Sequence, residues 1–150
     1  MSRPALRFAL FLGGLLALAA LPALGRWVRT STGEVCALDG MAVPASTRVR
    51  AVEPTGVERL FCCVDCADRW LARSDVVPGD LFVTDEATGE EIPAARAWFV
   101  ESRVPSHVAG GSRIHVFADV AAARRHAGDF GGRFLEGDRR PLGDRKGEHP

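Results

Sequence analysis

The stretch LFCCVDCADRWL, residues 60–71, decides the fold, because it joins a predicted strand to a predicted helix and carries three of the four cysteines. Before it, apolar and polar residues alternate over 47–52 and 57–61 with a turn sequence between them, which predicts a β-hairpin. After it, an amphipathic run with an N-cap at Asp65 predicts a helix. The sequence therefore places its cysteines in a strand-to-helix turn.

The chain after this turn predicts a second set of strands and a second helix. Asp119 followed by an alanine-rich segment predicts a helix over 120–127, and residues 137–150 lack periodicity, so we expect them to form a disordered tail. The fold class is therefore α+β, with two small β-hairpin-plus-helix units in a domain spanning 35–136. Further strands are expected at 81–84, 97–100, 113–118 and 133–135.

The N-terminal residues 1–25 are typical of a signal peptide or a membrane anchor. An uncharged run of 18 residues extends from Phe8 to Gly25 between flanking arginines. As a helix it would reach about 27 Å, close to the thickness of a bilayer's hydrocarbon core. Pro22 and the small residues after it favour cleavage. We expect a protein that is secreted or anchored at its N-terminus, in the periplasm or on the outer face of the cytoplasmic membrane, with residues 26–34 as a linker.

The distribution of charge argues against a nucleic-acid partner. The chain has 150 residues and a formal net charge of zero, with 47% hydrophobic and 25% charged residues. Residues 1–30 contain four arginines and no acidic residue, so the remainder has 15 basic against 19 acidic residues. A folded domain of this acidity lacks the basic surface that nucleic-acid binding requires.

The cysteines are grouped with a methionine in a pattern that favours a soft metal ion. Cys36 begins the group, Met41 follows it, and Cys62, Cys63 and Cys66 end it. Cu(I) prefers thiolate and thioether donors. Because neighbouring side chains in extended backbone point to opposite faces, we expect Cys62 and Cys66 to converge with Cys36, and Cys63 to be an alternative ligand or a bystander. The N-terminus of the helix is expected to lower the pKa of Cys66.

Other interpretations of the cysteines remain open. Zinc could be held by four sulfurs, and an oxidising compartment would allow two structural disulfides, either of which would stabilise a small interaction module. The spacing of Cys63 and Cys66 also fits a thiol oxidoreductase. An inward-facing Met41 thioether would favour copper, whereas one packed in the core would favour zinc. His107, in a loop beside Pro105, is a further candidate metal ligand.

Two blocks of the sequence resemble the NosL-type family of copper accessory proteins, which act in nitrous oxide reductase assembly. The first block, CALDGMAV (36–43) with LFCCVDCADRWL (60–71), is similar to the treble-clef, cysteine-rich segments that the family shares with TRASH-type metal-binding modules. The second, residues 81–102 with 113–137, resembles the family's C-terminal half. The chain departs from the family where Asp39 stands before Gly40-Met41, in place of the usual cysteine.

The resemblance implies an extracytoplasmic metallochaperone that passes Cu(I) to a client by ligand exchange. The client would be a metalloenzyme such as nitrous oxide reductase, or a copper transporter. The sequence contains no serine nucleophile motif, phosphate-binding loop or paired-carboxylate signature, so we predict that the protein is not an enzyme.

Overall fold

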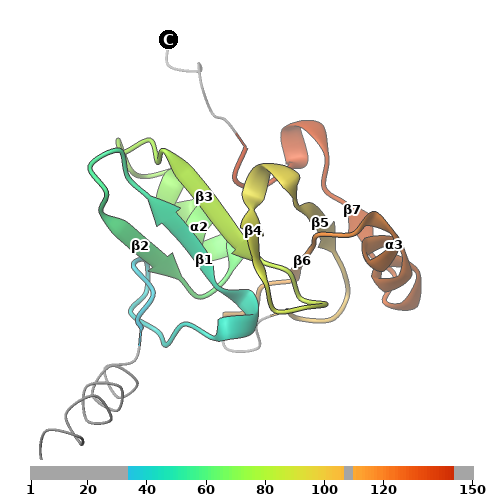
Figure 1. Cartoon of the computed structure of the whole chain (residues 1–150). Helices are drawn as coiled ribbons and strands as arrows, with labels where there is room; N and C mark the ends of the chain where they lie inside the picture. Colours follow the sequence, from blue (N-terminus) through green and yellow to red (C-terminus); the bar gives the residue numbers. More distant parts are fainter. Residues whose placement is uncertain (1–33, 107–109, 144–150) are drawn as a thin grey trace, which may run out of the picture. The chain divides into compact units, whose positions relative to one another are not determined.

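The computed structural model of the chain describes residues 34–106 and 110–143 (Figure 1). The predicted signal or anchor segment 1–25, nearly all of the predicted linker, and His107 lie outside the described residues. Among the residues that are described, none of the helices is both long enough and apolar enough to cross a membrane.

The first sheet has four antiparallel strands in the order β2-β1-β3-β4. A short 3₁₀ helix, η1 (Ala45–Thr47), leads into it, and β1 lies at its centre. The register places Val49 opposite both Phe61 and Val83, and all three side chains are buried. These three side chains form an apolar surface of the sheet, on which the cysteine-bearing segment packs. The strands are β1 (Val49–Val52), β2 (Glu58–Phe61), β3 (Asp80–Thr84) and β4 (Glu91–Pro93).

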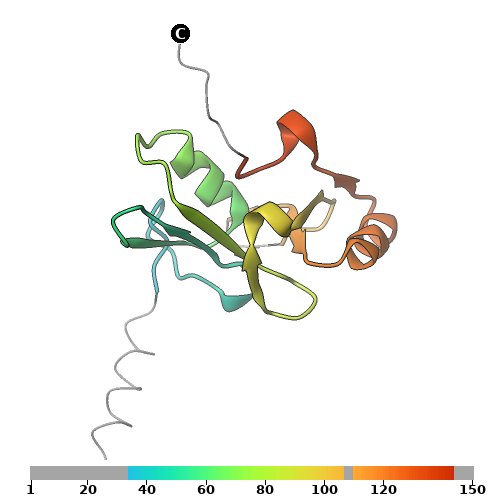
Figure 2. The ribbon, with the colours of Figure 1, turned by 45° about the horizontal axis from the view of Figure 1, so that its top comes forward.

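Helix α2 (Val64–Leu71) follows β2 and packs against this sheet (Figure 2). Val64 and Ala67 are buried, and the rings of Phe61 and Trp70 lie 5.4 Å apart. The predicted N-cap at Asp65 is wrong: the cap is Cys63, without a side-chain hydrogen bond. The helix begins at Val64, one residue before Asp65, and Val64 is buried in the apolar core.

The second sheet has three strands in the order β6-β5-β7, and helix α3 (Val120–Asp129) packs against it. The predicted cap of this helix is confirmed, since the Asp119 carboxylate accepts a hydrogen bond from the Ala122 N–H at 2.8 Å. The short 3₁₀ helix η2 (Ala94–Arg96) connects the two sheets. The strands are β5 (Trp98–Glu101), β6 (Ile114–Phe117) and β7 (Arg133–Phe134).

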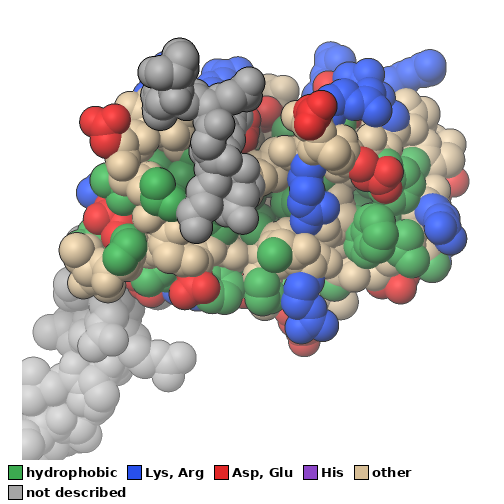
Figure 3. Space-filling model, turned by 90° about the horizontal axis from the view of Figure 1, so that it is seen from above, with side chains coloured by type: hydrophobic (Ala, Val, Ile, Leu, Met, Phe, Trp, Pro, Cys, Tyr) green, Lys and Arg blue, Asp and Glu red, His purple; other side chains and the backbone are tan. Residues whose placement is uncertain are grey.

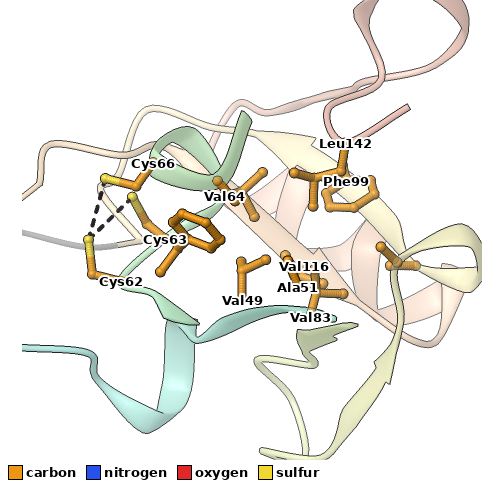
Figure 4. Packing of buried hydrophobic residues seen from close by; sticks show 14 of the residues in the cluster. Val49, Ala51, Cys62, Cys63, Val64, Cys66, Val83, Phe99, Val116 and Leu142 are labelled. Carbon is orange, nitrogen blue, oxygen red and sulfur yellow. Dashed lines mark hydrogen bonds between the residues drawn. The ribbon is translucent and has the colours of Figure 1, made fainter. Parts of the chain in front are cut away.

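The α+β class and the first hairpin followed by a helix are confirmed, but the second unit is arranged differently from the prediction. Strand β3 was expected to open that unit, yet it pairs with β1 and extends the first sheet together with β4. The hairpin of the second unit is β5 with β6. One apolar core joins the sheets, with Val83 and Phe99 among its buried members (Figure 4).

The predicted disordered tail is wrong for its first part. Residues 137–139 form the 3₁₀ helix η3, and the segment 140–143 after it packs on the domain. The Arg140 guanidinium donates hydrogen bonds to the carbonyls of Ala94 at 2.8 Å and Ala97 at 3.0 Å. Leu142 is buried, and its N–H donates to Asp68 on α2 at 3.2 Å. The composition of this segment alone indicates disorder. These contacts hold it on the domain, since Arg140 satisfies backbone carbonyls in and after η2.

Over the face seen in Figure 3, basic and acidic side chains are interspersed with apolar ones. An arginine that lines a shallow depression of the surface, Arg133, pairs with Glu101. The charge of this arginine is therefore compensated by its ion-pair partner.

Candidate metal centre

A tight loop at the start of the domain positions the first cysteine. Val35 and Ala42 form an antiparallel bridge, and within it the Cys36 N–H donates to the Met41 carbonyl at 2.7 Å. The Gly40 N–H donates to the Cys36 carbonyl at 2.8 Å, and its φ of +73° suits glycine because that region is strained for other residues. We refer to residues 35–42 as the cysteine loop.

Backbone pairing attaches the cysteine loop to β2, next to the other cysteines. The Ala37 N–H donates to the Leu60 carbonyl at 2.8 Å. Cys62 follows β2 directly and precedes the N-cap of α2, and Cys66 lies in the first turn of that helix. Their Sγ atoms are 3.5 Å apart (Figure 4). All four cysteines are free thiols and buried.

Four side chains converge at this point: Cys36, Asp39, Cys62 and Cys66. One potential ligand atom from each lies within 4.8 Å of the others. The Asp39 Oδ2 atom accepts hydrogen bonds from the Sγ of Cys66 at 3.3 Å and from the Sγ of Cys62 at 3.8 Å. The expected convergence of the three cysteines is therefore found. Asp39 was not predicted as a candidate ligand, because an aspartate before a glycine is common in turns. The signal that could have indicated it was its place between Cys36 and Met41.

The other candidate ligands are placed differently. The Cys63 Sγ lies 3.9 Å from that of Cys62 and is buried, but Cys63 is outside the group of four. Met41 joins the loop through its backbone and is 38% exposed, so it is not a core residue, and its role as a ligand stays a prediction. His107 lies outside the described residues, so its role stays a prediction.

The protonation of the metal-free site follows from burial. Desolvation raises the pKa of Cys62 to about 12, and desolvation together with hydrogen bonds to Cys62 and Asp39 raises the pKa of Cys66. The expected lowering of the pKa of Cys66 by the helix is thus wrong, because burial penalises the thiolate more than the helix N-terminus favours it. The Met41 N–H bond, followed by the thiol bonds, lowers the pKa of Asp39 despite some desolvation. The metal-free site therefore combines protonated thiols with a carboxylate.

A second polar cluster lies in the other half of the domain, where β6 faces the β3–β4 turn. His115 is buried, its Nδ1 lies 2.8 Å from a Glu86 oxygen, and its Nε2 lies 3.1 Å from the Val104 carbonyl. Both partners accept hydrogen bonds, and a ring that donates from both nitrogens is protonated, so this arrangement favours the cation. Burial would lower the pKa of His115, but these bonds outweigh it and raise the pKa. For His126, whose ring centroid is 4.1 Å away, burial and the charge of His115 lower the pKa.

Comparisons with known proteins support the fold. No protein-family model matches the sequence, and no curated protein matches it. Among solved structures, the crystal structure of the copper chaperone NosL from Shewanella denitrificans is similar, with a TM-score of 0.61 and 21% sequence identity. The match covers 72% of this chain and 90% of that chain. The resemblance predicted from the sequence is therefore confirmed at the level of the fold.

Proposed function

We propose that this chain is an extracytoplasmic accessory protein that holds Cu(I) through Cys36, Cys62 and Cys66 and passes it to a partner. The observation that carries the proposal is the convergence of three buried sulfurs, together with the Asp39 carboxylate, within 4.8 Å. Two or three sulfur donors suit Cu(I), which prefers soft ligands. Chance clustering of scattered core cysteines would not bring donors from two separate segments to one point.

The choice of a chaperone rests on the fold. A solved protein that shares this fold is a copper chaperone, and the resemblance of residues 36–43 and 60–71 points to the same class. We propose that the protein is not an enzyme and that its client is nitrous oxide reductase, another metalloenzyme or a copper transporter. The apolar segment within residues 1–25 supports a place in the periplasm or at the outer face of the cytoplasmic membrane.

A structural zinc site is the second candidate, and Asp39 favours it. Three cysteines and one carboxylate supply the four donors of a tetrahedral zinc site, and a carboxylate is a harder ligand than Cu(I) prefers. In that case the metal would stabilise an interaction module rather than be passed on. A thiol oxidoreductase has less support, because Cys63 and Cys66 are buried and the pKa of Cys66 is raised, whereas reactive thiols are accessible thiolates.

Metal analysis of the full chain, purified under reducing conditions and offered Cu(I) and Zn²⁺ together, separates these functions. We expect one tightly bound Cu(I) per chain, lost in Cys62→Ser and Cys66→Ser, with circular dichroism unchanged in both. Cys63→Ser is the matched control and should retain the metal, since Cys63 lies outside the group of four. Bound zinc, with unfolding of the Cys62→Ser and Cys66→Ser proteins, would instead establish the structural site.

A further inference from the structure

The four converging side chains differ in their access to solvent. Cys36 is 2% exposed, Cys62 is fully buried and Cys66 is 6% exposed, whereas Asp39 is an exposed residue. The sulfurs are therefore enclosed by β2, α2 and the cysteine loop, and the carboxylate lies on the open side. A ligand arriving from solvent reaches the centre of the group on the side of Asp39.

The two oxygens of Asp39 have different partners. Oδ1 accepts a hydrogen bond from the Met41 N–H at 3.0 Å, which holds the side chain to its own turn. Oδ2 faces the sulfurs of Cys62 and Cys66. The carboxylate can therefore release a metal ion from Oδ2 and stay anchored through Oδ1, without any rearrangement of the loop backbone.

The chemistry of the donors ranks them for a soft ion. Thiolates bind Cu(I) strongly, whereas a carboxylate oxygen is a hard and weak ligand for it. Asp39 is thus the weakest of the four donors and also the most accessible. In a site built for permanent retention, a fourth sulfur at this position would close the coordination sphere.

We propose that Asp39 is the exchange position of this site, through which an acceptor carrying a soft sulfur ligand takes Cu(I). The proposal rests on the proposed function, because it describes how the same site releases its metal. The acceptor's sulfur forms a bond to copper as the Asp39 oxygen withdraws. The bonds to the cysteines then break one at a time, and the released thiolates take up the protons that the acceptor's thiols lose on binding copper. Copper remains Cu(I) throughout, so no oxidant or reductant takes part.

The experiment measures transfer of Cu(I) from the loaded full chain to excess dithiothreitol, by separating protein from small molecules at timed intervals and determining the copper that stays with the protein. Asp39→Cys replaces the weak donor with a strong one, and we expect transfer to be slower by about tenfold or more. Asp39→Asn keeps an oxygen for the Met41 N–H but removes the negative charge, and we expect transfer to be several-fold faster. Both variants should still load one Cu(I).

The matched control is Asp75→Cys, which adds a thiol at an exposed position beyond the end of α2 and should transfer at the original rate. Transfer from Asp39→Cys and Asp39→Asn at the original rate would overturn the exchange role while leaving copper binding intact. Failure of the unaltered chain to load Cu(I) would instead overturn the proposed function, and the exchange role with it.

Discussion

Copper affinity should depend steeply on pH, since the site must lose protons in order to bind. The pKa of Cys62 is about 12 and that of Cys66 is also raised, so both thiols carry their protons in the metal-free protein near neutral pH. Each sulfur that binds as a thiolate releases one proton, and each proton released changes the affinity about tenfold per pH unit. Asp39, whose pKa is lowered, releases none in this range.

The sign and the size of the pH effect on copper affinity follow from the number of protons released. Lowering the pH adds protons that compete with the metal, so affinity falls as pH falls. The two thiols with raised pKa values, Cys62 and Cys66, give a loss of about 100-fold for each pH unit.

Competition against a colorimetric Cu(I) chelator, with the chelator's own protonation accounted for, gives the affinity between about pH 6 and pH 8. The slope of log affinity against pH is the number of protons released. A slope of one or less in the unaltered protein would refute the assignment of Cys62 and Cys66 as joint thiolate ligands.

Three further predictions concern stability, each measured by denaturant unfolding. Leu142→Ala should destabilise the domain by about 2 kcal/mol, because the segment after residue 139 packs on the core; no change would show that it does not. Gly132→Ala should cost about 2 kcal/mol, since its Cβ would lie 2.8 Å from a side-chain carbon, whereas Gly128→Ala, with nothing within 4 Å, should stabilise α3 by up to about 1 kcal/mol. The raised pKa of His115 contributes stability below its ordinary value of about 6.5, and this contribution is lost as pH rises through the folded-state pKa. The stability difference between the protein and Glu86→Gln should therefore shrink with rising pH, and a constant difference would contradict the ion pair.

Local sequence signals were sufficient where the structure is determined by local contacts. The first hairpin follows from alternating residues around a short turn, and the cap of α3 follows from Asp119. The convergence of Cys62 with Cys66 follows from their places on the two sides of the short strand-to-helix turn. Each of these features depends on residues close together in the chain, for which periodicity and capping rules are direct evidence.

Features that depend on distant residues could not be predicted in this way. The pairing of β3 with β1 joins strands that a helix separates in the sequence, so nothing local distinguishes it from pairing with a later strand. The rise in the pKa of Cys66 comes from burial, which only the packed structure reveals. The place of Asp39 beside the cysteines depends on the cysteine loop meeting β2 through a backbone hydrogen bond.

The packed segment 137–143 has a practical consequence for anyone who shortens or tags this protein. Trimming the chain at residue 136, as its composition would encourage, removes Arg140 and Leu142 and exposes the carbonyls and apolar groups that they cover. The loss would also reach the helix that carries Cys66, since Leu142 is hydrogen-bonded to Asp68 there. A purification handle therefore belongs after residue 143. A metal-binding defect in a shorter version would report the loss of the packed segment 137–143 rather than damage to the cysteines.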